Sequence, residues 1–131
     1  MNEISPIKIT LEQQWIDNNG PSYFISIDEE GNAEYIGINN VKTQGRQIFK
    51  VTTNEVKDII DEAEIIYFFS LRQVYGDLIN FSNSPQISIL IIYENKCKRI
   101  TYVKNNTVRF PRSLAMLESK IGNIIGITKL I

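Results

Sequence analysis

The sequence of 131 residues has no histidine, a single cysteine, and no apolar run of the roughly 20 residues that a membrane helix requires. Histidine is the commonest general base, proton shuttle and zinc ligand, so its absence excludes most enzyme templates, including Ser-His and Cys-His nucleophiles. The single Cys97 cannot form an internal disulfide, which excludes a disulfide-built extracellular scaffold. Because the first ten residues contain no signal-peptide core, we expect no membrane association and a cytoplasmic location if Met1 is the native start.

The composition is that of an ordinary globular protein, with 43% hydrophobic and 22% charged residues. At this length we expect a single domain over residues 1–131. The net charge of −1 conceals an uneven distribution: residues 1–65 contain five basic and twelve acidic residues (−7), and residues 66–131 contain nine and three (+6). The asymmetry indicates either a polar binding face or two halves that neutralise each other after folding.

Alternating apolar residues predict a β-hairpin in the first half of the chain. Tyr23, Ile25 and Ile27 alternate with polar residues, and Asp28–Gly31 suits a type I turn closed by a left-handed glycine. The return strand is Ala33–Asn39. Two further strands are expected, at Ile7–Glu12 and Arg46–Val51.

Two amphipathic helices are expected, with a second hairpin between them. The stretch Thr52–Glu55 is a capping box that opens a helix with Val56, Ile59, Ile60 and Ala63 on one face. Gln86–Tyr93 and Lys98–Val103 form the second hairpin, and the final helix starts at Pro111 and ends near Gly126. We therefore predict an α+β fold of order β-β-β-β-α-β-β-α, with an antiparallel sheet of about five to six strands and two helices on one face.

Several short stretches resemble an uncharacterised prokaryotic family, domain of unknown function 6438. Its members have the patterns C-x-G-x-C-P-x-Y and D-G-x-x-x-Y-x-G, which match Pro21–Tyr23 and Gly31–Gly37 here. Weaker matches continue through Tyr67–Tyr75, Lys98–Ile100 and the final helix, so the resemblance covers roughly residues 7 to 125. The family has no established activity, so the resemblance implies a fold and no chemistry.

The chain departs from this family at its two cysteines, which would fall at Ile16 and Gly20, and at an aspartate, which would fall at Asn83. A redox, metal or disulfide role for the cysteine pair is therefore not carried over. The loss of the pair fits an intracellular chain.

The remaining reactive residues favour a structural interpretation. Cys97 lies between lysines that would lower its thiol pKa if it were exposed, but we expect it to pack in a strand as a small hydrophobic residue. Asp58, Asp61 and Glu62 lie opposite the apolar stripe of their helix and form a solvated face. Because there is also no phosphate-binding glycine loop, we expect no cofactor, no metal and no enzymatic activity.

The first function hypothesis is a non-catalytic module that binds an unidentified protein partner. The sheet face left free by the helices would present the aromatic residues Trp15, Phe24 and Tyr35 as interface anchors. Trp15 is either such an anchor or a plug at one end of the core. Exposed sheet edges also suggest a homodimer.

The alternative hypothesis is single-stranded nucleic-acid binding through the basic stretch Lys96 to Arg112. This stretch contains aromatic residues among its basic ones and no acidic residue, a combination that suits a phosphate backbone and stacked bases. Its candidate phosphate or other anion contacts are Lys96, Lys98, Arg99, Lys104, Arg109 and Arg112. The near-neutral net charge of the chain argues against this role.

Overall fold

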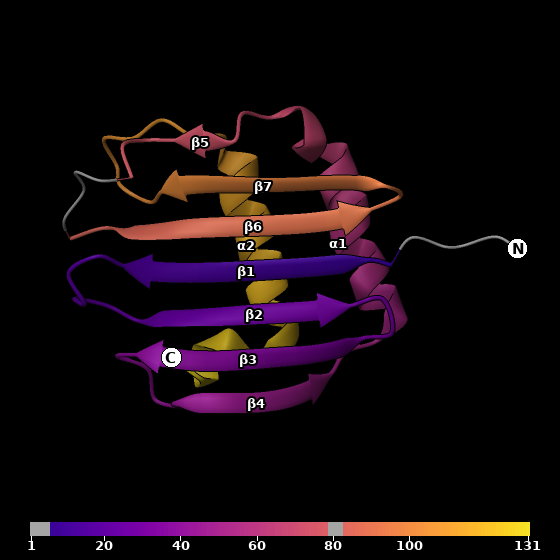
Figure 1. The fold of residues 1–131 in the computed structure, drawn as a ribbon, viewed down its shortest axis with the longest axis horizontal. Helices are drawn as coiled ribbons and strands as arrows, with labels where there is room; N and C mark the ends of the chain where they lie inside the picture. The colour runs from indigo at the N-terminus through magenta and orange to yellow at the C-terminus, as the bar shows by residue number, and fades with distance from the viewer. Residues whose placement is uncertain (1–5, 79–82) are drawn as a thin grey trace, which may run out of the picture.

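The computed structural model describes residues 6–78 and 83–131. Seven strands form one sheet in the order β4-β3-β2-β1-β6-β7-β5, and two helices run behind it (Figure 1). All neighbouring strands are antiparallel except β5 and β7. The strands are β1 (Lys8–Trp15), β2 (Ser22–Asp28), β3 (Asn32–Asn39), β4 (Gly45–Lys50), β5 (Val74–Tyr75), β6 (Pro85–Tyr93) and β7 (Lys96–Val103).

The predicted α+β class, element order and placement of the helices are confirmed. The strand not expected is β5, which is only two residues long and follows a short 3-10 helix, η1 (Phe68–Ser70). A two-residue strand has no alternation for a pattern to detect, and β5 forms by pairing with β7.

The turn between β2 and β3 fixes which residues of these strands face the helices. The Asp28 carboxylate accepts hydrogen bonds from the backbone N–H groups of Glu30 and Asn32, each at 2.9 Å. Gly31 has a φ of +85°, and a Cβ there would lie 2.0 Å from the Val51 carbonyl oxygen, so only glycine fits. The resulting register pairs Ile25 with Tyr35.

The sequence indicates the start of the first helix and the end of the second, whereas the second helix begins at Arg112, one residue after the predicted Pro111. In α1 (Thr53–Ile65), the Glu55 N–H donates to the Thr52 hydroxyl at 3.0 Å and the Thr52 N–H donates to the Glu55 carboxylate at 2.9 Å, which completes the capping box. In α2 (Arg112–Ile125), Gly126 ends the helix with a φ of +71°. A second 3-10 helix, η2 (Ile127–Lys129), follows. Neither α-helix is long and apolar enough to cross a membrane.

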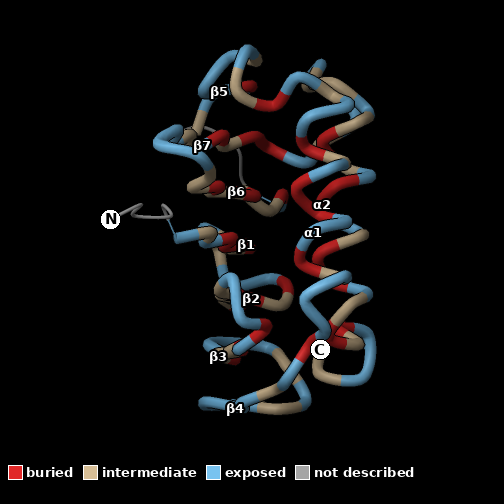
Figure 2. Tube along the Cα trace, turned by 90° about the vertical axis from the view of Figure 1, so that its right-hand side faces the viewer, coloured by how far each residue is buried: buried red, intermediate tan, exposed pale blue. Residues whose placement is uncertain are grey.

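Both helices pack on the same face of the sheet, which we call the covered face (Figure 2). Alternate residues of every central strand point into this layer, and Ile9, Ile25, Ile89 and Ile100 are fully buried there. The apolar stripes of α1 and α2 close the core from the other side. The opposite face, which we call the open face, has no helix over it in the part of the chain that the structure describes. The prediction that the first ten residues contain no signal peptide falls partly on residues 1–5, which lie outside the described residues.

Candidate functional site

The open face contains an exposed apolar group, which we call the open-face cluster: Phe24, Ile36, Ile38 and Ile48. Phe24 of β2 pairs with Ile36 of β3, and Ile48 of β4 pairs with Glu34, two residues along β3 from Ile36. Ile48 is 64% exposed and Ile38 49%, whereas Phe24 and Ile36 are half-buried. Apolar side chains that remain in water on a sheet face are typical of interaction surfaces.

Charged side chains surround this cluster on the β4 side. The Arg46 Nε lies 2.7 Å from a Glu34 carboxylate oxygen, and the Lys50 Nζ donates to the Asn32 side chain at 2.9 Å. Ile48 lines a hollow of about 400 Å³ that both Glu34 and Arg46 also line. An apolar centre with a charged rim is the usual anatomy of a protein interface.

Of the three aromatic anchors expected on this face, only Phe24 lies there. Tyr35 is fully buried on the covered face, where it stacks on Tyr23 at 6.2 Å between ring centroids and its hydroxyl donates to the Thr43 carbonyl at 2.9 Å. The expectation for Tyr35 was therefore wrong. Ile36 takes the outward position because the Asp28–Gly31 turn pairs Phe24 with Ile36.

Trp15 packs at one end of the sheet. It occupies the same parity in β1 as Ile9 and Leu11, so it belongs to the covered-face side, and it is half-buried. A Cβ at Gly20 would lie 2.3 Å from the Trp15 ring, so the indole rests on that glycine. The indole N–H is buried without a hydrogen-bond partner among the described residues. These contacts support the plug interpretation of Trp15 rather than the exposed anchor.

The structure divides the six basic residues of the predicted anion-binding stretch among three places. Lys96 lies over the Phe69 ring at 4.9 Å, and Lys98 reaches the Phe69 carbonyl at 3.5 Å, both near the β6–β7 turn. Arg99 pairs with Leu90 on the open face. The other three, Lys104, Arg109 and Arg112, follow the far end of β7, where they line one pocket.

Lys104, Arg109 and Arg112 line what we call the α2 pocket, a hollow of about 590 Å³ at the start of α2. All its charged lining residues are cationic, and Val108, Phe110 and Ala115 supply apolar walls. Phe110 packs on Tyr102 at 4.5 Å between ring centroids. The Lys104 Nζ is already neutralised by Glu118 at 3.1 Å, so Arg109 and Arg112 are the cations most available to an anion.

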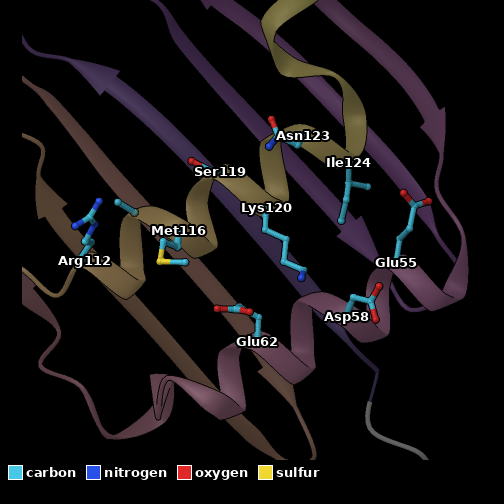
Figure 3. A pocket seen from close by; sticks show the side chains of 10 residues that line it. Glu55, Asp58, Glu62, Arg112, Met116, Ser119, Lys120, Asn123 and Ile124 are labelled. Atoms are coloured by element: carbon cyan, nitrogen blue, oxygen red, sulfur yellow. The ribbon is translucent and has the colours of Figure 1, made fainter.

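A groove of about 680 Å³ runs between α1 and α2 on the outer side of the helix layer (Figure 3). Glu55, Asp58 and Glu62, spaced three and four residues apart, form its α1 wall. Lys120 extends from α2 toward this wall, and Met116, 60% exposed, lies beside it. The sequence predicted a solvated acidic face of Asp58, Asp61 and Glu62; Asp58 and Asp61 are exposed, as expected, whereas Glu62 is half-buried in the groove wall.

A buried polar group joins α2 to the sheet. The Tyr102 hydroxyl donates to the Glu118 carboxylate at 2.6 Å, and Lys104 binds the same carboxylate. Glu118 is only 7% exposed, which the sequence did not indicate because its neighbours Leu117 and Ile121 suggested a purely apolar contact. Burial, followed by the Glu118 charge and this hydrogen bond, raises the pKa of Tyr102 far above its ordinary value of 10.0. This set of Tyr102, Lys104 and Glu118 has a structural role because the Glu118 carboxylate is enclosed.

Within residues 6–78 and 83–131, no three histidine, cysteine, aspartate or glutamate side chains are placed to hold a metal ion. The prediction that Cys97 packs as a small hydrophobic residue was wrong: its thiol is free and the residue is exposed. The reason is its position opposite Ile92, next to the turn of the β6–β7 hairpin on the open face.

The fold and the site define an α+β protein with a two-layer body whose distinctive surface is an uncovered sheet face. Residues 8–125 match the family described as Domain of unknown function (DUF6438), and the chain belongs to this family. The resemblance drawn from the sequence motifs is therefore confirmed. A comparison with curated proteins finds no match.

Proposed function

We propose that this protein is a non-catalytic module that binds a protein partner through the open face. The observation that supports this most is the open-face cluster, in which Phe24, Ile36, Ile38 and Ile48 stay at the surface although a full apolar core lies behind them. Ile48, the most exposed member, lies beside the other three rather than alone, and a contiguous apolar group is more informative than a single exposed residue.

Burial of this cluster by a partner supplies a favourable free energy of binding. Full burial of one exposed isoleucine contributes about 1.5–3 kcal/mol. Ile38 and Ile48 gain most from this burial, and the half-buried Phe24 and Ile36 add smaller amounts, which together suit a transient interface whose partner also satisfies the charged rim. Phe24, at the centre of the face and flanked by Glu12 and Ile36, is the expected hot spot.

We place this binding in the cytoplasm, because the exposed free thiol of Cys97 suits a reducing compartment. Fractionation of source cells tests the location. Recovery of the chain with secreted or periplasmic proteins would contradict it.

Affinity capture from native lysate tests the proposed function. The tagged wild type is compared with a Phe24→Ala/Ile38→Asp variant, and a matched control, Ile65→Asp, changes a 72% exposed isoleucine on α1. Each lysate is split into nuclease-treated and untreated halves. We expect a protein partner that survives nuclease and is lost only with the Phe24/Ile38 variant. Equal capture by all three chains would overturn the role of the open face.

Single-stranded nucleic acid is a second candidate, and the α2 pocket is the observation that favours it. Arg109 and Arg112 lie there beside Phe110, an arrangement that suits a phosphate next to a stacked base. An Arg109→Glu/Arg112→Glu variant is compared with Lys96→Glu/Arg99→Glu, which changes the charge equally at other places. Anisotropy of a labelled oligonucleotide at rising salt gives the readout. Equal loss in both variants would argue against a site at the pocket.

A further inference from the structure

The strand β4 is the longest sheet element with an unpaired edge in the described chain. It pairs with β3 on one side and has no strand on the other, whereas the opposite edge of the sheet is β5, only two residues long. Every second residue of β4 points its N–H and C=O groups away from β3. Such an edge is a template for another extended chain.

The side chains along β4 specify what kind of chain fits that edge. On the open face the order is cation, apolar, cation: Arg46, Ile48 and Lys50. The intervening residues, Gln47 and Phe49, lie on the covered-face side. Arg46 uses its Nε to bind Glu34, yet 67% of its side chain remains exposed, so its remaining N–H groups can donate to a second carboxylate.

We propose that β4 binds an extended partner segment in which one apolar residue is flanked, two positions away on each side, by acidic residues. The segment adds an eighth strand to the sheet, with its apolar residue beside Ile48 and its carboxylates beside Arg46 and Lys50. This inference rests on the proposed function, because it specifies how and with which chemistry the partner meets the open face.

A second copy of the chain fits the edge less well. Antiparallel pairing of two β4 strands with Ile48 opposite Ile48 places Arg46 of each copy opposite Lys50 of the other. Two pairs of like charges directly opposite each other destabilise such a dimer. Charge complementarity therefore selects an acidic partner over a homodimer.

The test is an NMR titration of the isotopically labelled full chain with two peptides. The first contains a central valine, threonines next to it and glutamates outside them; the second has lysines in place of the glutamates. We expect the acidic peptide to shift the backbone signals of Gly45–Lys50 and to bind at least about tenfold more tightly than the basic one. Each peptide is symmetric about its central valine, so parallel and antiparallel pairing with β4 are both detected.

A charge-reversed variant, Arg46→Glu/Lys50→Glu, should prefer the basic peptide by a similar factor. Its matched control is Lys96→Glu/Arg99→Glu, which makes the same charge change on β7 and should keep the wild-type preference. An exchange of peptide preference shows that the contact is direct, which a general loss of fold would not produce.

Three outcomes would overturn the inference: no signal change at β4 with either peptide, equal affinity for both peptides in the wild type, or dimerisation in sedimentation that Ile48→Lys abolishes. If the peptides fail while capture still depends on Phe24 and Ile38, the open face binds its partner without strand addition. If capture fails as well, the proposed function itself is wrong.

Discussion

The two faces of the sheet differ in how their isoleucines are used. On the covered face Ile9, Ile25 and Ile89 are fully buried under α1 and α2, whereas on the open face Ile48 and Ile38 remain largely in water. The buried set lies on β1, β2 and β6 and the exposed set on β3 and β4, but every member is an isoleucine in a strand, so β propensity does not distinguish the two sets. Burial of the covered face therefore holds the fold together, whereas the side chains of the open face stay accessible, as the proposed binding requires.

The largest expected effect is on the covered face. Ile25→Ala leaves a cavity in a fully buried layer and should reduce the free energy of unfolding by about 2–5 kcal/mol. Ile48→Ala removes the same atoms from a residue 64% exposed and should change it by less than about 0.5 kcal/mol. Urea denaturation of both variants gives the comparison, and similar losses would contradict the division between the faces.

Because Tyr23 and Tyr102 are buried, we expect the chain to lose stability at alkaline pH. Burial and the Glu118 charge raise the pKa of Tyr102, and the same two causes raise that of Tyr23, so both stay protonated in the folded chain above pH 10. The unfolded chain releases these protons near pH 10.0. Their stabilisation is therefore complete below pH 10 and declines above it, by up to about 1.4 kcal/mol per pH unit for each group.

Tyr102→Phe tests this pH dependence. The variant should lose about 1–3 kcal/mol at neutral pH, because the Glu118 carboxylate loses its hydroxyl donor, and its stability should fall less steeply above pH 10. Tyr67→Phe, at a residue 74% exposed, is the control and should leave both quantities unchanged. Thermal unfolding between pH 7 and 11 measures them, and a wild-type slope in Tyr102→Phe would contradict the assignment.

At the edge of the covered face, Gly20→Ala should displace the indole of Trp15. The new methyl group would overlap the ring, so the side chain must move toward solvent at a cost of about 1–3 kcal/mol. Trp15 is the single tryptophan of the chain, so its fluorescence emission reports the change directly. We expect a red shift; an unchanged emission maximum would mean that Trp15 does not rest on Gly20.

The smallest effect is expected from the open-face ion pair. Arg46→Ala removes the contact with Glu34, but the Arg46 side chain is 67% exposed and its charge is screened by solvent. The variant should change the free energy of unfolding by about 0–1 kcal/mol in either direction. A loss well above this range in urea denaturation would show that the open face contributes to the fold.

The fold was largely accessible from the sequence because its signals are local. The capping box at Thr52, the turn closed by Gly31 and the alternation along β6 each act through neighbouring residues, and each has the predicted structure. The register of the first hairpin was also predictable from the sequence, because the turn that pairs Phe24 with Ile36 also excludes Tyr35 from the open face.

The candidate site was less accessible because it depends on contacts between distant segments. The burial of Glu118 depends on Tyr102 and Lys104, more than ten residues away in the chain. The six basic residues are close in sequence, but β7 extends between them, and about 3.3 Å per residue places its two ends far apart. Exposure of Cys97 likewise follows from its place at a strand end rather than from its residue type.

Hydrogen exchange of the chain, alone and with its captured partner, tests the division between the two faces most directly. We expect new protection of backbone amides in β4, together with β2 and β3, and unchanged exchange in α1 and α2. Protection confined to the helix groove or to the α2 pocket, with β2 to β4 unchanged, would contradict it.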